Sequence, residues 1–138
     1  MTDQLFGYWT KIKGERPFPS EQEIDLADIR DVWDHCFLIQ IKKTADIIDY
    51  RYIYMGESIK EAYGDDLTGQ SVYSRLVSPE AATVVSKFHK VLDTLSPVFD
   101  ESEFVNLQDN VIKYRQCLLP LGAREGIVDY ILGGMSWK

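Results

Sequence analysis

Several chemistries are missing from this sequence of 138 residues. It has no GxxxxGK or GxGxxG loop for phosphates, no HExxH or paired-histidine metal spacing, and no Gly-x-Ser-x-Gly nucleophile elbow. Its 22 acidic and 15 basic residues give a net charge of −7, which argues against nucleic acid or an anionic membrane surface as partner. The sequence therefore predicts no catalytic site and no metal site.

Long hydrophobic runs are absent as well. No apolar run approaches the roughly 20 residues of a transmembrane helix, and the first 14 residues lack the features of a secretory signal. We therefore expect a cytoplasmic protein. The two cysteines, Cys36 and Cys117, form no CxxC pair and lie in apolar runs. We expect buried, reduced thiols, with a reactive thiol or a disulfide as the alternative.

The remaining composition is that of a folded domain, with 45% hydrophobic and 27% charged residues. An apolar stripe predicts a helix over residues 3–13. Asp25 is expected to cap a second helix, and residues 57–64 form a short helix that ends at a glycine. The Ser-Pro-Glu sequence at 78–80 starts a long helix that runs to about Leu95.

Five segments have the β-branched and aromatic composition of strands, and the last three are joined by short turns. They are residues 36–43, 47–56, 97–105, 111–121 and 127–137. Apolar residues on both sides of 111–121 predict that both sheet faces are covered, the second by the N-terminal helix or by another subunit. Alternation places Tyr50, Tyr52 and Tyr54 on one face, for sheet packing or as an aromatic contact surface.

The order of these elements and four motifs resemble the PAS domain family. The motifs are Tyr8-Trp9 with residues 14–33, the central segment YRYIYMGESIKEAYGDDLTG (50–69), YRQCLLPLG (114–122) and VDYILGGMSW (128–137). The sequence is most similar to the bacterial variant in which a short stand-alone protein is a single PAS domain. Ser20-Glu21 is a departure, since related chains often carry Arg there.

The resemblance implies an α+β fold, with a five-stranded antiparallel sheet that has helices on one face and N-terminal helices before it. Residues 1–35 would be a helical extension and residues 36–138 the PAS-like sensor domain. PAS domains bind ligands between the sheet and the helices, here 57–95. Carried over by position, the wall of this pocket would be Ile53, Met55, Tyr63, Leu67, Phe88, Leu92, Cys117, Leu119 and Met135. The alternative is that these side chains fill the core.

The cofactor is left unknown by the resemblance. Haem-binding PAS domains use a histidine on the long helix, so His89 is the one position for such a ligand, although we expect a partly exposed histidine without haem. Light-sensing PAS domains need a cysteine in a polar motif after the short helices. Residues 63–66 contain none, so we expect no flavin.

We therefore expect a non-enzymatic sensory module that binds a small apolar ligand or a partner protein. It would signal through its N-terminal helix or a dimer interface, as a homodimer or to a separate signalling protein, and the contact residues would be Leu5, Phe6, Trp9 and Ile12. Its acidic surface favours a basic or neutral partner. The alternatives are a structural dimerisation domain, or a small α+β enzyme whose candidate groups are Asp49, Arg51, His89 and Asp129.

Overall fold

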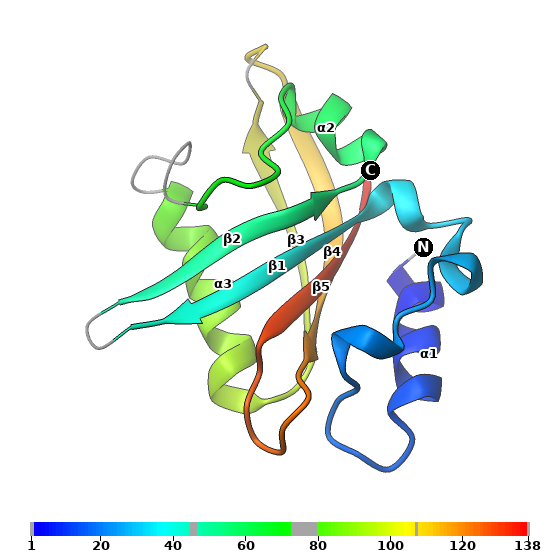
Figure 1. The fold of residues 1–138 in the computed structure, drawn as a ribbon. Coiled ribbons are helices and arrows are strands. Elements are labelled where there is room, and N and C mark those ends of the chain that lie inside the picture. The colour runs from blue at the N-terminus through cyan, green and yellow to red at the C-terminus, as the bar shows by residue number, and fades with distance from the viewer. Residues whose placement is uncertain (1, 45–46, 73–79, 107, 138) are drawn as a thin grey trace.

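A computed structural model describes residues 2–44, 47–72, 80–106 and 108–137 of the chain. Its antiparallel sheet has five strands in the order β2–β1–β5–β4–β3 (Figure 1). The strands are β1 (Cys36–Lys43), β2 (Ile48–Met55), β3 (Val98–Val105), β4 (Val111–Leu121) and β5 (Tyr130–Trp137). The helices are α1 (Thr2–Lys13), α2 (Glu57–Tyr63) and α3 (Glu80–Thr94). The expected α+β architecture, a five-stranded antiparallel sheet with helices, is confirmed.

The segment between α1 and β1 departs from the prediction of a second α-helix. It forms short 3₁₀ turns, at Glu21–Glu23, Leu26–Ile29 and Trp33–His35. Asp25 does cap the second of these, since its carboxylate accepts a hydrogen bond from the Ala27 N–H at 3.0 Å. The backbone is extended at Ile24 and Asp25, between the first two turns. Val32 is buried in the cluster beneath α1. The predicted Ser78-Pro79 start of α3 lies outside the described residues.

A β-bulge in β2 overturns the predicted shared face of the three tyrosines. Leu38 of β1 pairs with Tyr54 but Ile39 pairs with Tyr52, so Ile53 is an extra residue without a partner. An extra residue reverses the face of every side chain beyond it. Tyr50 and Tyr52 therefore pack beneath α3, whereas Tyr54 stacks on Trp33 on the opposite face, with ring centres 4.2 Å apart.

Both faces of the sheet are covered, as predicted. The α3-face cluster lies beneath α2 and α3 and consists of Phe37, Ile39, Tyr50, Met55, Ile59, Leu67, Val72, Val85, Phe88, Val91, Val98, Tyr114, Leu118, Ile131 and Met135. The α1-face cluster lies on the opposite side and consists of Leu5, Trp9, Phe18, Ile29, Val32, Cys36, Cys117, Leu119, Leu121, Val128 and Leu132. The N-terminal helix is thus the cover of the second face.

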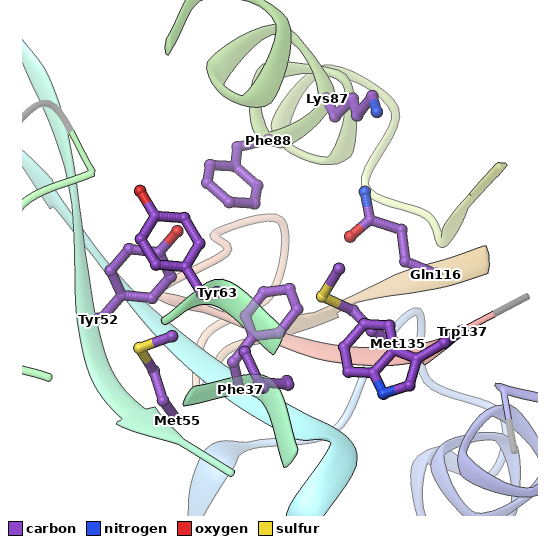
Figure 2. A pocket seen from close by; sticks show the side chains of 10 residues that line it. Phe37, Tyr52, Met55, Tyr63, Lys87, Phe88, Gln116, Met135 and Trp137 are labelled. Carbon is purple, nitrogen blue, oxygen red and sulfur yellow. The ribbon is translucent and has the colours of Figure 1, made fainter. Parts of the chain in front are cut away.

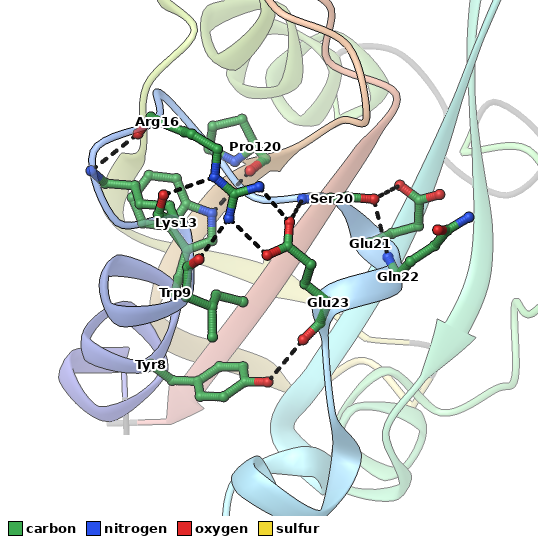
Figure 3. Close-up of polar contacts among 10 residues, drawn as sticks. Tyr8, Trp9, Lys13, Arg16, Ser20, Glu21, Gln22, Glu23 and Pro120 are labelled. Atoms are coloured by element: carbon green, nitrogen blue, oxygen red, sulfur yellow. Dashed lines mark hydrogen bonds and ion pairs between the residues drawn. The ribbon is translucent and has the colours of Figure 1, made fainter.

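A buried indole hydrogen bond holds helix α1 against the sheet. The Trp9 indole N–H donates to the carbonyl of Pro120 at 2.9 Å, at a level of β4 that β3 no longer reaches (Figure 3). Leu5 and Trp9 are 0% and 2% exposed. The prediction that these two side chains form a dimer or partner interface is therefore wrong, because they pack on their own sheet. Phe6 and Ile12 are half-buried.

Polar contacts tie the end of α1 to the segment that follows (Figure 3). The Arg16 guanidinium donates to the carbonyls of Ile12 and Lys13 and to both carboxylate oxygens of Glu23, at 2.7 Å each for Glu23. Glu23 also accepts from the Ser20 N–H at 2.9 Å in a capping box. We call these contacts the Arg16–Glu23 latch. The division of the chain at residue 35 stays a prediction.

No helix in the described part of the chain is both long and apolar enough to cross a membrane.

Candidate ligand-binding site

A cavity of about 100 Å³ lies between the sheet and helices α2 and α3 (Figure 2). Aromatic and apolar side chains make up most of its wall. The wall is formed by α2, α3 and every strand of the sheet except β3. The lining residues are Phe37, Tyr52, Met55, Ile59, Tyr63, Lys87, Phe88, Gln116, Met135 and Trp137. A mostly apolar hollow with a few polar groups is the usual character of a small-molecule site.

The bulge in β2 brings two wall residues to the same side. Tyr52 and Met55 are three positions apart and would face opposite sides of a regular strand. The extra residue, Ile53, turns both toward the cavity and is itself 37% exposed. The prediction that Ile53 lines the pocket is therefore wrong, because it assumed unbroken alternation.

A glycine sets the floor of the cavity. Gly133 of β5 pairs with Phe37 of β1, and the Phe37 ring lies across the glycine. A Cβ at position 133 would be 2.0 Å from the ring atom Cζ, which is closer than atoms can approach. Phe37 can lie flat on the sheet only because residue 133 has no side chain, and this leaves room above the ring.

One end of the cavity is polar. Lys87 of α3 forms a close ion pair with Asp100 of β3 and donates to the Tyr114 hydroxyl at 3.3 Å. Burial lowers the pKa of Lys87, but the hydrogen bond to Asp100, together with Tyr114, outweighs it and leaves the pKa raised. The amide N–H of Gln116 points at the same Asp100 carboxylate from 3.5 Å. Lys87 is therefore charged, and its charge is matched within the protein.

The opposite side of the cavity carries a neutral hydroxyl. Burial raises the pKa of Tyr52, and the neighbouring Tyr63 and Tyr114 raise it further. Tyr52 therefore keeps its proton over the ordinary pH range. The two tyrosines on this side, Tyr52 and Tyr63, come from β2 and α2, and Figure 2 shows their hydroxyl groups on the same side of the cavity.

Four of the nine predicted wall residues line the cavity, namely Met55, Tyr63, Phe88 and Met135. Leu67 is buried behind the wall, where its N–H contacts the Met55 sulfur at 3.2 Å, and Leu92 packs between the two clusters. Cys117 and Leu119 belong to the α1-face cluster. Placing these two in the pocket was wrong, because Gln116 faces the cavity and its neighbour in the strand must face away.

Sequence reasoning missed six lining residues: Phe37, Tyr52, Ile59, Lys87, Gln116 and Trp137. Gln116 carried a usable signal, since it is the polar residue of an otherwise apolar half-strand, QCLLPL. Ile59 and Tyr63 also share one helix face at a spacing of four residues. Lys87 gave no such signal, because a lysine on a helix is usually exposed.

The two cysteines are buried, free thiols, as predicted. Burial raises the pKa of both Cys36 and Cys117 to about 12. Each pairs with Gly134, from opposite sides of β5. Two strand spacings therefore separate their Cα atoms by roughly 10 Å, which exceeds the reach of a disulfide, about 7 Å. The alternative of a disulfide is excluded in this fold.

The four candidate catalytic groups do not form one cluster. Asp49 and Arg51 form a 3.5 Å ion pair on β2, and Asp129 lies 3.6 Å from Arg124 before β5. His89 is on α3, where its Nδ1 is 2.5 Å from the Tyr50 hydroxyl, and it does not line the cavity. Among the described residues there is no group of three or more potential metal ligands. None of these four candidate groups lines the cavity.

Solved structures with the same fold are numerous. A LOV protein from Rhodobacter sphaeroides has a TM-score of 0.58 and 16% identity, covering 79% of this chain and 64% of that chain. This chain thus spans less than two thirds of that protein. The PAS domain of a Colwellia psychrerythraea protein has a TM-score of 0.59 and 13% identity, covering 83% of this chain and 98% of that chain.

The dark-state LOV domain of the blue-light photoreceptor Aureochrome1 has a TM-score of 0.60 and 13% identity, covering 84% of each chain. At such low identity these structures show a shared fold. No curated protein matches at the sequence level. The model of the PAS domain family, however, matches residues 1–136, which is nearly the whole chain. On this match, and with the sheet order and helices that accompany it, the chain belongs to the PAS domain family.

Proposed function

We propose that this PAS domain is a non-enzymatic cytoplasmic sensory module, in which a small apolar molecule in the cavity changes how α1 sits on the opposite face. One observation carries the proposal. The cavity and the seat of α1 lie on the two faces of the same strands, β4 and β5. A molecule that binds the two arrangements of α1 with different affinity shifts the equilibrium between them.

Alternation along single strands supplies the mechanical connection. Gln116 lines the cavity, and the next residue, Cys117, contacts α1 through its thiol, 4.0 Å from the Thr2 carbonyl. In the same way Phe37 lies under the cavity and Cys36 belongs to the α1-face cluster. A shift of these strands toward or away from a ligand therefore also moves the surface on which α1 rests.

The dimer or partner contact remains part of the proposal, with a changed set of residues. Phe6 of α1 touches Phe99 of β3, with ring centres 5.1 Å apart, and Phe99 is 54% exposed. Val105, farther along β3, and Val111 of the neighbouring strand β4 are exposed as well. A homodimer or a separate signalling protein would contact Phe6, which moves with α1, and the neighbouring Phe99 of β3, rather than the buried Leu5 and Trp9.

The described residues do not fit the large cofactors known from this fold. One matching structure is described as a flavin analogue study of a light-oxygen-voltage domain. Here the cavity volume is about 100 Å³, whereas drug-sized ligands occupy about 300–1,000 Å³. Both cysteines lie on the α1 face, away from the cavity. His89, the only predicted haem position, has its Nδ1 engaged by Tyr50 outside the cavity wall.

Native mass spectrometry of the full chain, compared with its denatured mass, is the first test. A small mass lost on denaturation would support a bound ligand, and the same spectrum reports whether the protein is a dimer. Hydrogen exchange of the full chain with and without added toluene, a probe of cavity size, then tests the coupling. We expect the amides of α1 to change their exchange rates when toluene binds.

Two results would contradict the proposal in different ways. Toluene binding that leaves α1 exchange unchanged would mean that the cavity does not communicate with the opposite face. A clean apo mass together with no toluene binding would favour a structural module with a filled core.

A further inference from the structure

The wall of the cavity contains a polar atom that no group of the described residues binds. Gln116 is 7% exposed, and its amide oxygen Oε1 has no hydrogen-bond partner among the residues that the structure describes. Buried carbonyl oxygens in folded proteins are nearly always paired with protein or water. An unpaired acceptor in the wall of a ligand-sized hollow therefore indicates what an occupant would supply.

The direction of the Gln116 amide is fixed by its neighbour. The ionised carboxylate of Asp100 only accepts hydrogen bonds, so the amide group that faces it must be the NH₂. That contact is 3.5 Å, and Lys87 binds the same carboxylate oxygen. Oε1 is consequently turned the other way, and Figure 2 shows it on the side of the amide that faces the cavity. The occupant would present an N–H or O–H donor to this oxygen.

The charges at the polar end point to a neutral occupant. Lys87 and Asp100 neutralise each other in a close ion pair, so neither needs a charged ligand. Tyr52 is held in its neutral form by burial. An anion would have to displace Asp100 from Lys87, and a cation would lie beside the Lys87 ammonium group. Neither charge sign is favoured by the groups that line the cavity.

The size and wall of the cavity favour a single ring. An apolar cavity of about 150 Å³ holds benzene. The cavity here is smaller, at about 100 Å³, so a single ring is the upper limit and enters only when Met55 and Met135, which border the cavity, move outward. Methionine side chains are flexible and adjust to a guest. The rings of Phe37 and Phe88 form two further parts of the wall, which suits an aromatic guest in edge or stacked contact.

We propose that the cavity takes a small, neutral, single-ring molecule with an O–H or N–H donor, and that Gln116 Oε1 is the group that selects it. This inference rests on the proposed function, because it presumes that the cavity binds a ligand. It adds the chemical class of that ligand and names the residue that determines specificity.

Phenol and toluene are the matched probes, since they share a shape and differ by one hydrogen-bond donor. Phenol loses more hydration than toluene on leaving water, so the two dissociation constants cannot be compared directly. The measured quantity is the ratio of the phenol to the toluene dissociation constant, and this ratio is compared between the wild-type protein and its variants. The variants are Gln116→Met, which keeps the volume but removes the acceptor, and the control Met55→Leu, which keeps Gln116. Binding is followed by NMR through the methyl groups of Met55 and Met135, or of Met135 alone in the control.

In Gln116→Met we expect the ratio to shift about tenfold toward toluene, the discrimination that one buried hydrogen bond provides. In Met55→Leu the ratio should stay as in the wild type. The wild-type protein offers a second readout that needs no variant. Both probes carry an aromatic ring whose ring current acts on Gln116, but phenol should shift its side-chain amide resonances more than toluene, because only phenol donates a hydrogen bond to Oε1. This comparison holds even if Gln116→Met fails to fold.

The two levels of the proposal fail differently. If both probes bind, but the ratio is unchanged in Gln116→Met and the two probes shift the Gln116 amide resonances equally, selection by Gln116 is overturned while ligand binding stands. If neither probe shifts the methionine methyl resonances, the cavity binds no such ring, and both this inference and the small-molecule part of the proposed function are overturned.

Discussion

The two faces of the sheet are built from the same strands but are filled in different ways. On the α1 face, Trp9 is 2% exposed and its indole N–H is paired with Pro120. On the α3 face a cavity remains, and the Gln116 Oε1 in its wall is unpaired among the described residues. The α1 face is closely packed, whereas the α3 face retains a hollow. Such a division is consistent with binding sites sacrificing some packing.

The two faces receive side chains from alternate positions of β4. Gln116 lies on the open side, and Cys117 and Leu119 lie on the closed side at 0% exposure. A substitution one residue along this strand therefore tests a different property. Changes on the α1 face should mainly alter stability, and changes on the α3 face should mainly alter binding.

Trp9→Ala should have the largest effect. It removes a buried indole and leaves the Pro120 carbonyl unpaired, which we expect to lower the free energy of unfolding by about 3–5 kcal/mol. Urea denaturation measures this loss. Trp9→Phe keeps one aromatic ring but loses the N–H donor and part of the buried ring surface, with an expected loss of about 1–3 kcal/mol. Equal losses in both variants would show that the hydrogen bond, rather than apolar packing, seats α1.

Trp9→Ala has a second readout, which is the rate at which the two buried thiols are labelled. Cys36 and Cys117 have pKa values raised to about 12 by burial beneath α1. Thiolates, rather than thiols, react with alkylating reagents, so both residues should be labelled slowly in the wild-type protein. Faster labelling of the two thiols in Trp9→Ala, in buffer without urea at a pH of about 8, would show that α1 leaves the sheet. Unchanged labelling would mean that the helix stays in place.

Gly133→Ala should have an intermediate effect, on both stability and ligand binding. The new methyl group would meet the Phe37 ring at 2.0 Å and push it toward the cavity. Overpacking of this kind lowers stability by about 1–3 kcal/mol, and phenol and toluene should bind less tightly to the narrowed cavity. Urea denaturation and the NMR titration measure the two effects.

Gly7→Ala is the control for that substitution. Gly7 lies on the exposed side of α1 with nothing within 4 Å of an added Cβ. The same methyl group should stabilise the protein by about 0.5–1 kcal/mol, because alanine favours a helix over glycine. Gly133→Ala behaving like Gly7→Ala would show that Phe37 moves aside without cost, so that the glycine does not hold the cavity open.

Composition, periodicity and resemblance predict the fold well because they depend on local regularity. Strand β4 begins and ends at the predicted residues, and Gly64 ends α2 in the left-handed conformation that glycine allows. The predictions fail where regularity is broken. The bulge at Ile53 depends on the pairing of two strands, and strand composition does not reveal where an extra residue is inserted.

The site was predicted less completely than the fold for a related reason. Which side of β4 faces α3 depends on the whole sheet, so the sequence could group Cys117 with Leu119 but could not tell that they face α1. The burial of Lys87 depends on Asp100, which comes from a strand beyond the end of the helix. Contacts of this kind follow from tertiary structure and leave no local pattern.

The Arg16–Glu23 latch should contribute the smallest effect. Hydrogen bonds from Arg16 and from the Ser20 N–H lower the pKa of Glu23 to about 2, from its ordinary value of 4.5. The folded state thus favours the charged carboxylate. Its contribution to stability is complete above pH 4.5 and is lost as the pH falls toward 2. Because both side chains are exposed, solvent screens the ion pair and the contribution is small.

Glu23→Gln should therefore lower the urea midpoint slightly at pH 7 and hardly at all at pH 2, where the wild-type carboxylate has itself lost most of its advantage. Glu21→Gln is the matched control, since it removes the same charge two residues away without touching Arg16. An equal pH dependence in both variants would mean that net charge, and not the latch, is responsible. A loss from Glu23→Gln as large as that from Trp9→Ala would reverse the comparison of the two faces, because the seat of α1 would then depend on an exposed polar contact instead of the buried indole.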